Sequence, residues 1–429
     1  MMSEVLILVL SFVILLAIGV PVAWSIGISC LLTILASIDS LAAFTTVSQR
    51  MATGLDSFSL LAIPLFILAG QIMNQGGIAN RLIDFAKALM GGLPGGLIYV
   101  NVIAAMLFGA ISGSAVAATS AIGGILGPRM KEEGYSNEFG AAVNITASTT
   151  GLVIPPSNVL IVYSLASGGV SIASLFLAGY LPGILMGLAL MLVAAVWIKK
   201  KKYPAGERSS FKYITKTFLD ALPSLLLLVV VIGGIVTGIF TATEASGIAV
   251  LYTLILSFIN KELKISSLHQ VFLGSVGTTA IVMLLIATSM SMSWVMSYEN
   301  IPQAVSAALL GISDNIFVIL LIINLLLLFV GTFMDMTPAV LIFTPIFLPV
   351  VEALGVDPVH FGIMMVMNLC VGLCTPPVGS VLFIGVSVAN STIEKVIKPL
   401  LPLYVAMFIV LLLVTFIPQI SLWLPELFE

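Results

Sequence analysis

The chain has 429 residues, of which 60% are hydrophobic and only 8% are charged, and its formal net charge is −3. Soluble domains carry roughly 25% charged residues, so this composition excludes an ordinary soluble protein and predicts an all-α polytopic membrane protein. The only basic cluster is a short loop, which disfavours nucleic acid as a partner.

Three cysteines, Cys30, Cys370 and Cys374, lie in apolar runs. Cys370 and Cys374 are spaced to share one helix face, but no histidine or third cysteine accompanies them. Structural zinc sites use four such ligands. We therefore interpret the cysteines as small packing residues and not as a metal or redox pair.

The first part of the chain contains several apolar runs of the length that spans a membrane, about 17–25 residues. Two close-spaced helices are expected at about 4–18 and 22–38, and a third span at about 57–75. Residues 76–94 place charged residues between apolar positions. That pattern is typical of an interfacial amphipathic helix.

The next segment, about 95–132, is apolar but rich in glycine and serine at its centre. We expect a re-entrant helical hairpin there. The alternative is two ordinary packed helices that meet through small residues. A broken helix at about 137–166 and a span at about 174–198 complete a first half, residues 1–198.

A basic linker at 199–216, interpreted as a cytoplasmic anchor, separates this half from a second half, residues 217–429. The second half repeats the pattern of the first. Its expected elements are spans at about 217–237, 243–259 and 270–297, an interfacial segment around 298–314, a hairpin at about 315–353, a broken helix at about 358–390 and a last span at about 399–424.

Two double prolines, Pro155-Pro156 and Pro376-Pro377, interrupt the broken helices. Proline removes a backbone donor and clashes with the carbonyl four residues earlier, so neither helix can run unbroken. In hydrocarbon the freed carbonyls must meet protein, water or an ion. Broken helices at matching positions of two halves indicate the binding site of a secondary transporter. The alternative is that the prolines only kink the helices.

The two halves align without gaps at an offset of 221 residues, which is 376 − 155. In this register Ile125 falls on Ile346, Pro128 on Pro349, Gly134 on Gly355, Gly151 on Gly372 and Leu152 on Leu373. The match indicates an internal repeat. Each half is expected to have about five full crossings, one of them broken, and one hairpin. Because five is odd, the second repeat would be inverted in the membrane.

The positions of the basic residues agree with inverted repeats. If the N-terminus lies outside, all of the 16 Lys and Arg residues except Arg50 fall in cytoplasmic segments. This distribution is the one that the positive-inside rule expects.

The hairpin tips and helix breaks would supply the oxygen ligands that hard cations such as Na⁺ seek. The candidate Na⁺ ligands, by side chain or backbone, are Ser112, Ser114, Gly151, Ile154, Pro155, Gly331, Phe333, Asp335, Gly372, Thr375 and Pro376. The candidate substrate-binding residues are Ser112, Ser114, Ser157, Asn158 and Asp335. Ser157 and Asn158 open a half-helix whose N–H groups suit a substrate carboxylate.

Asp335 is the acidic residue expected to lie deepest in the membrane, and its counterpart at the 221 offset is Ser114. An intramembrane carboxylate indicates a functional site, so we interpret Asp335 as a cation or substrate ligand. The alternative is a helix cap inside the hairpin tip. Glu244, expected where two spans meet at the outer face, is interpreted as capping or bracing the scaffold.

Three features resemble the large membrane permease subunit of TRAP transporters (DctM-like), the tripartite ATP-independent periplasmic carriers. They are the paired Pro-Pro breaks, the segment Gly-Ile-Phe-Thr-Ala-Thr-Glu-Ala-Ser-Gly at 238–247, and the proline- and glycine-rich stretch at 344–362. The resemblance covers nearly the whole chain. It implies a Na⁺-driven secondary active importer of organic acids with an elevator-type fold, located in the bacterial inner membrane, and not an enzyme.

The resemblance also implies partners: a small four-helix membrane subunit, a soluble periplasmic substrate-binding protein, the surrounding membrane lipid and an organic-acid substrate. Similar family members carry dicarboxylates, keto acids or sugar acids such as sialic acid. The acidic tip around Asp335 favours a polyhydroxylated monocarboxylate such as sialic acid over a small C4-dicarboxylate.

Two other classes of protein are alternatives. A serine-type intramembrane protease needs a serine and a histidine that face each other, and the chain has only two histidines, His269 and His360. An aspartyl type needs two membrane carboxylates that share a proton, and Asp335 has no evident deep partner. A channel would differ because its flux would neither saturate nor couple to a gradient.

The charge distribution predicts that both termini face the periplasm and that the 199–216 linker faces the cytoplasm. Single cysteines at Ser3, Ser209 and Glu429, treated with an impermeant thiol reagent in intact cells, test this topology. We expect labelling at the two ends and none at Ser209. Labelling at Ser209 alone would contradict the inverted repeats.

Overall fold

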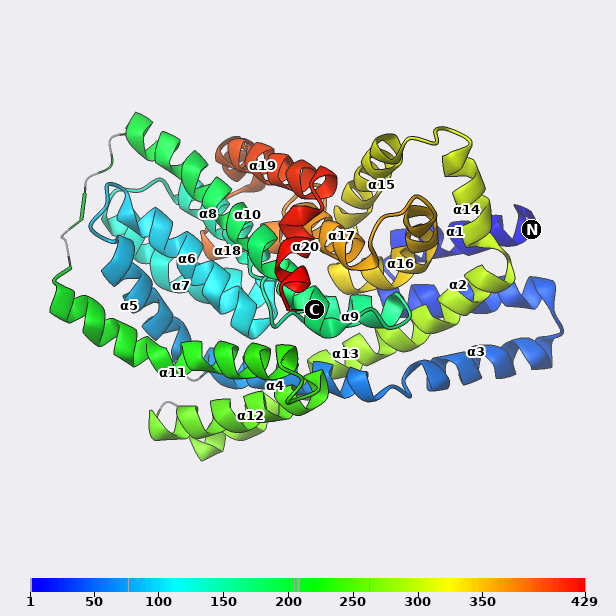
Figure 1. Cartoon of the computed structure of the whole chain (residues 1–429), viewed down its shortest axis with the longest axis horizontal. Helices are drawn as coiled ribbons and strands as arrows, with labels where there is room; N and C mark the ends of the chain where they lie inside the picture. The colour runs from blue at the N-terminus through cyan, green and yellow to red at the C-terminus, as the bar shows by residue number, and fades with distance from the viewer. Residues whose placement is uncertain are drawn as a thin grey trace.

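The computed structural model describes residues 2–75, 77–201, 203, 205–206, 209–261 and 263–428, which form a bundle of helices (Figure 1). The first half contains α1 Met2–Ala17, α2 Val22–Ser37, α3 Ser40–Gly54, the short 3-10 helix η1 Phe58–Leu61, α4 Ala62–Gln75, α5 Ile78–Met90, α6 Gly96–Ser112, α7 Ala115–Glu132, α8 Asn137–Thr150, α9 Asn158–Ala166 and α10 Ile172–Lys201. The second half contains α11 Phe211–Val236, α12 Ala242–Ile259, α13 Ile265–Tyr298, α14 Ile301–Leu310, α15 Ile316–Gly331, α16 Met336–Ala353, α17 Pro358–Leu373, α18 Ser380–Val388, α19 Ile393–Phe416 and α20 Gln419–Glu426.

Seven helical segments of the described chain are long and apolar enough to cross a membrane. A helix satisfies its backbone hydrogen bonds within itself, which hydrocarbon requires. The all-helical membrane fold predicted from composition is therefore confirmed. The expected linker at 199–216 is described only in part, because Lys202, Pro204, Glu207 and Arg208 lie outside the described residues.

Two elements differ from the expected ones. Helix α3 was not expected, because residues 40–54 mix polar and apolar side chains and look like a loop between spans. Tertiary contacts hold it: the Arg50 guanidinium lies 5.2 Å from the centre of the Trp294 ring on α13, a favourable cation–π geometry. The last span, expected at about 399–424, is present as α19 but ends at Phe416. Pro418 cannot donate the hydrogen bond that would continue α19, and the separate short helix α20 follows.

Glu244 forms a capping box at the start of α12. The Thr241 hydroxyl accepts from the Glu244 amide at 3.2 Å, and the Glu244 carboxylate accepts from the Thr241 amide at 2.8 Å. Two backbone donors that the helix leaves unpaired are satisfied in this way. The interpretation of Glu244 as a cap is confirmed.

Each expected hairpin is a helix–turn–helix, and each expected broken helix is two helices joined by an irregular segment. The bounds recur at the 221 offset: α7 covers 115–132 and α16 covers 336–353. Helices α10 and α19 begin at Ile172 and Ile393, which also differ by 221. Both double-proline peptide bonds are cis.

The two halves pack across one another. Half-helix α9 of the first half lies against α16, and half-helix α18 of the second half lies against α7. The Cys370 thiol donates to the Thr149 carbonyl at 3.2 Å, and these two residues are 221 positions apart. The ends of α8 and α17 therefore meet at equivalent positions of the two halves.

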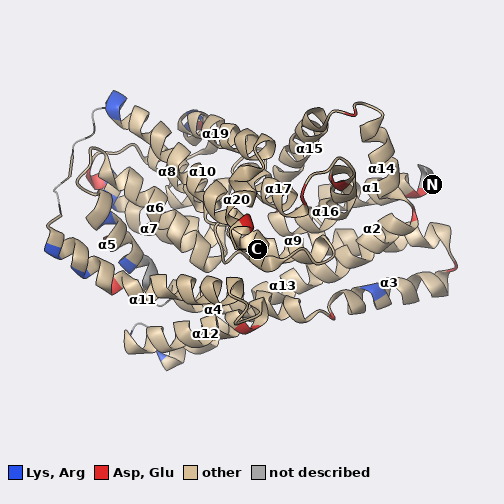
Figure 2. Ribbon diagram, in the orientation of Figure 1, with Lys and Arg blue, Asp and Glu red and all other residues tan. Residues whose placement is uncertain are grey.

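The charged residues gather at opposite ends of the molecule. Figure 2 shows Lys and Arg at the end formed by α5, the last turn of α10 and the start of α11. The opposite end, where α1 begins and α14 leads to α15, carries Asp and Glu. Helices α5, α6, α7 and α11 lie toward the basic end, and α1, α2, α3 and α14 lie toward the acidic end (Figure 1).

Candidate functional site

The first helix break is a buried segment between α8 and α9. Residues 151–157 are not helical, and of these only Ile154 is partly exposed. The end of α6 packs directly on the break, since a Cβ added to Gly151 would lie 2.6 Å from the Cα of Gly109. Both backbones have ordinary φ at this contact, so it is the lack of space, and not the backbone conformation, that requires glycine.

The second break, between α17 and α18, is built in the same way but is more open. A Cβ added to Gly372 would lie 2.7 Å from the Cα of Gly331, at the end of α15. The Gly379 amide donates to the Thr332 carbonyl at 3.2 Å, which ties the break to its own hairpin tip. Thr375 and Pro376 are half-buried.

Free backbone oxygens collect at both breaks and at the second tip, as the proline argument predicts. Within the described part of the chain, the carbonyls of Gly151, Ile154, Pro155, Gly331, Phe333, Thr375 and Pro376 accept no hydrogen bond. The Gly372 carbonyl is partly used, because it accepts from the Thr375 amide at 2.8 Å. The carbonyl of Cys374 accepts from the Tyr404 hydroxyl of α19.

The two hairpin tips use their polar side chains as helix caps. Ser114 accepts from the Ala117 amide at 3.2 Å at the start of α7. Asp335 accepts from the Met336 amide at 2.9 Å at the start of α16, and its side chain is otherwise exposed. The cap that was the alternative for Asp335 is therefore present. It uses one carboxylate oxygen and leaves acceptor capacity for a cation.

A polar cavity of about 390 Å³ lies at the first hairpin tip. Three predicted site residues, Ser112, Ser114 and Asn158, line it together. A Cβ added to Gly113 would lie 2.9 Å from Asn158 Nδ2, so the start of α9 reaches the tip. Ser157 is buried beside it, and its hydroxyl has no partner among the described residues. Asp335 does not line this cavity, although Thr337 does.

Several cavity residues were not among the predicted site residues. Gln71 and Asn74 come from α4, Thr278 comes from α13 and Thr337 from α16. Gln71 and Asn74 are polar residues three apart within an apolar span, so their spacing on one helix face was a usable signal. Thr278 and Thr337 had no such signal, because isolated threonines are common in membrane helices.

The cysteines and His360, also considered from the sequence, are buried in the packed interior. Each cysteine is buried and free, and the described residues contain no cluster of three or more His, Cys, Asp or Glu that could hold a metal. His360 Nδ1 lies 2.7 Å from the Ser421 hydroxyl. Both side chains are almost fully buried, and Ser421 also donates to the Pro418 carbonyl. This pair holds α20 on α17 and is closed to a substrate.

The broken helices, the hairpin tips and the cavity between them define a multi-pass membrane transport protein. A model of the family described as "Tripartite ATP-independent periplasmic transporter, DctM component" matches residues 9–420. The chain therefore belongs to this family of transporter permeases, and it is not an enzyme.

Curated relatives agree with this family. The chain is 56% identical over 418 residues to the "Uncharacterized protein YgiK" of Salmonella typhimurium, covering 97% of this chain and 96% of that protein. It is 40% identical over 382 residues to the "Sialic acid TRAP transporter large permease protein SiaM" of Vibrio cholerae, covering 89% of each. It is 38% identical over 425 residues to the "C4-dicarboxylate TRAP transporter large permease protein DctM" of Rhodobacter capsulatus, covering 95% of this chain and 96% of that protein.

A solved structure shares the fold. The YdaH transporter of Alcanivorax borkumensis superposes with a TM-score of 0.65 at 14% sequence identity, covering 90% of this chain and 89% of that one. The likeness at this low identity concerns the fold alone.

The close glycine contacts predict which substitutions at the breaks destabilise the protein. Gly151→Ala and Gly372→Ala place a methyl group against backbone, which we expect to cost about 1–3 kcal/mol. Gly247→Ala on α12 is a matched control, because its added Cβ meets nothing within 4 Å. Thermal unfolding of the purified protein measures the difference. Equal melting temperatures for all three variants would contradict the packing of the hairpins on the breaks.

Proposed function

We propose that this chain is the permease of a Na⁺-coupled importer of an organic acid. The observation that carries the proposal is the set of free carbonyl oxygens at the two breaks, next to the hairpin tips. Na⁺ is a hard cation that prefers oxygen ligands, and discontinuous membrane helices are where secondary transporters bind it. The proposed ligands are those predicted from the sequence at both breaks, with Asp335 in the second set.

The two halves are proposed to be inverted repeats, residues 1–198 and 217–429. The recurrence of helix bounds at 221 residues supports a repeat. The reciprocal packing of α9 on α16 and α18 on α7 is the pattern that a two-fold relation produces. The contact between Thr149 and Cys370 supports the same relation, since equivalent residues of two repeats meet only near a two-fold axis. The separation of charge in Figure 2 supports an orientation with the basic end in the cytoplasm.

An elevator movement is proposed because the substrate cavity lies between two groups of helices. Its lining comes from the hairpin tip and α9 on one side and from α4 and α13 on the other. Movement of the hairpins and half-helices along α4 and α13 would carry a bound substrate across the membrane. The α6–α7 and α15–α16 pairs are then re-entrant hairpins.

The substrate is proposed to be a polyhydroxylated monocarboxylate, of the sialic acid type. The cavity is lined by the amides of Gln71, Asn74 and Asn158 and by several hydroxyls, and none of the described residues that line it is charged. Amides and hydroxyls pair with hydroxyl groups, whereas a dianion would leave two charges without a cationic partner. One carboxylate can be received by the N–H groups that open α9. The relatives named above include a sialic acid permease and a C4-dicarboxylate permease, so the alternative is a C4-dicarboxylate.

The permease is proposed to work in the bacterial inner membrane with a small membrane subunit and a periplasmic substrate-binding protein. The tripartite family to which the chain belongs supports these partners. Transport assays of the chain therefore need both partners.

The breaks are expected to be required for transport and not for folding. Replacing Pro155-Pro156 or Pro376-Pro377 with Ala-Ala restores backbone donors, so the helices can re-form and withdraw the free carbonyls from the ion sites. We expect uptake to collapse while membrane insertion and the amount of folded protein are retained. Full uptake by both double variants would mean that the prolines are only kinks.

Asp335 is expected to contribute to Na⁺ affinity. Asp335→Asn keeps one acceptor oxygen but removes the charge, and we expect it to raise the Na⁺ concentration for half-maximal uptake by about tenfold, or about 1.4 kcal/mol. Asp335→Ala also loses the cap of α16 and should be worse. The measurement is uptake into proteoliposomes under an imposed Na⁺ gradient, with both partners present.

Two outcomes would contradict parts of this proposal. Equal uptake after Na⁺ is replaced by choline would exclude Na⁺ coupling. An unchanged Na⁺ dependence in Asp335→Asn together with a changed substrate affinity would assign Asp335 to the substrate and not to the ion.

A further inference from the structure

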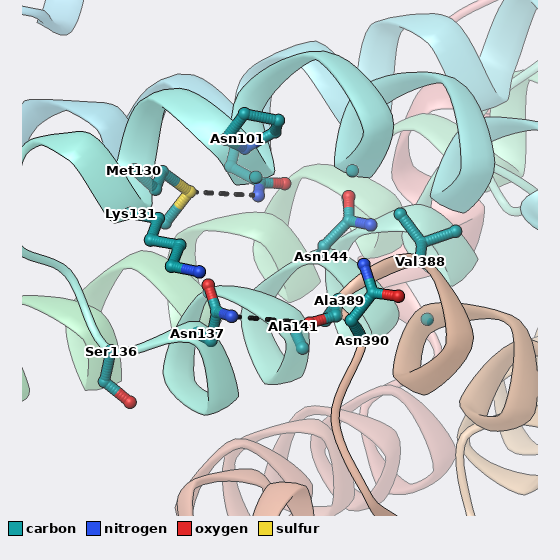
Figure 3. A pocket seen from close by; sticks show the side chains of 15 residues that line it. Asn101, Met130, Lys131, Ser136, Asn137, Ala141, Asn144, Val388, Ala389 and Asn390 are labelled. Atoms are coloured by element: carbon teal, nitrogen blue, oxygen red, sulfur yellow. Dashed lines mark hydrogen bonds between the residues drawn. The ribbon is translucent and has the colours of Figure 1, made fainter.

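A second cavity, of about 280 Å³, lies at the basic end of the molecule and away from the proposed transport site. Its walls are α7, the first two turns of α8, and the end of α18, with Asn101 of α6 at its inner side (Figure 3). It shares no lining residue with the cavity at the first hairpin tip. Nothing in the proposed transport mechanism uses it.

Two asparagines that line this cavity carry buried side-chain oxygens without a hydrogen-bond partner among the described residues. Asn101 and Asn144 are 1% and 3% exposed. Asn144 Nδ2 donates to the Thr119 carbonyl at 2.8 Å, and Asn101 Nδ2 donates to the Met130 sulfur at 3.9 Å. Both Oδ1 atoms have no partner among the described residues. A buried acceptor left unpaired is costly, so these oxygens suit a ligand that donates hydrogen bonds.

One charged side chain, Lys131, lines the cavity. It is exposed, and Figure 3 shows it extending over Asn137 at the opening. Asn137 Nδ2 donates to the Ala389 carbonyl at 3.4 Å, and its oxygen lies on the side of Lys131 (Figure 3). The cavity thus has acceptor oxygens in its depth and one positive charge at its opening.

The other half of the molecule fills the equivalent space. The positions that correspond to Gly123, Gly127, Gly140 and Asn144 at the 221 offset are Thr344, Leu348, Phe361 and Met365, all buried. Tyr163 enters the same region: its hydroxyl donates to the Pro358 carbonyl at 2.6 Å, and its ring lies on Gly362. Pro358 and Gly362 are the counterparts of Asn137 and Ala141 in the cavity. The cavity is therefore a difference between two otherwise similar halves.

We propose that this cavity is a second binding site, for a small carboxylic acid that carries hydroxyl groups. The carboxylate pairs with Lys131, and the hydroxyls donate to the oxygens of Asn101 and Asn144. A simple cation would meet the oxygens but would be repelled by Lys131, and an uncharged sugar would leave Lys131 unused. The site goes beyond the proposed transport function, because binding here requires no movement of a solute across the membrane.

Binding of D-gluconate to the full chain in lipid nanodiscs tests the chemistry of the ligand. Gluconate has one carboxylate and several hydroxyls, hexanoate has the carboxylate alone, and glucose has hydroxyls without the charge. We expect titration calorimetry to detect gluconate, and to detect hexanoate and glucose at least about tenfold more weakly. Absence of gluconate binding, or equal binding of hexanoate, would overturn the proposal.

Substitutions at two neighbouring glycines on α7 test whether gluconate binds in this cavity. Gly127 lines it and Gly124 does not, yet a Cβ at either position meets nothing within 4 Å. Gly127→Leu introduces the side chain found at the equivalent position 348 and fills the cavity, whereas Gly124→Leu is the matched control. We expect gluconate to bind at least about tenfold more weakly to Gly127→Leu only. Identical titrations for the two variants would place the gluconate in the transport cavity and overturn the second site.

Two further variants separate the charge from the hydrogen bonds. Lys131→Met should weaken gluconate and leave glucose unchanged, and Lys131→Arg should restore gluconate. Asn101→Leu removes an unpaired oxygen while losing only the weak bond to Met130. It should weaken gluconate without lowering the melting temperature of the ligand-free protein. Unchanged gluconate affinity in both Lys131→Met and Asn101→Leu would also overturn the proposal.

Discussion

The whole architecture depends on backbone groups that prolines leave unpaired inside an apolar protein. At each break the helix loses hydrogen bonds, and in hydrocarbon those groups must be satisfied or occupied. The chain brings the end of a hairpin helix against each break, with glycine facing glycine so that the backbones can touch. Some carbonyls are satisfied by side chains from other helices, such as that of Cys374, which accepts from the Tyr404 hydroxyl of α19. Others remain free beside the tips, where a cation can meet them.

The two halves of the chain are held together by reciprocal contacts between half-helices and hairpins. Each half-helix packs on the hairpin of the other half, so neither break is held by its own half alone. This arrangement explains why the two breaks have similar geometry. It also makes any difference between the halves informative. Where the first half has glycines and unpaired asparagine oxygens, the second has bulky buried side chains, against which Tyr163 of the first half packs. The first half thereby gains a polar cavity at its basic end.

The chemistry proposed for the cavity at the first hairpin tip follows from its described lining residues, none of which is charged. Amides and hydroxyls line it, and the start of α9 reaches the hairpin tip. An organic anion in such a site depends on helix N–H groups and on hydroxyl pairing, because no cationic side chain is at hand. Asp335 lies outside this lining and caps α16. A role in cation binding, separate from the substrate, is consistent with that position.

The sequence by itself determined the membrane class, most helices, the two breaks and the 221-residue recurrence, because apolar run length, proline and glycine act locally. It also singled out Ser112, Ser114 and Asn158, which line one cavity in the structure, since a hairpin tip and a half-helix start are local features. Only the tertiary structure decided that α3 is a helix, since a contact with Trp294 on distant α13 helps hold it. It alone brought Gln71 and Thr278 to the cavity and showed Asp335 as a cap. These outcomes depend on which distant helices pack together, and the packing is determined by the sum of the long-range contacts in the folded chain.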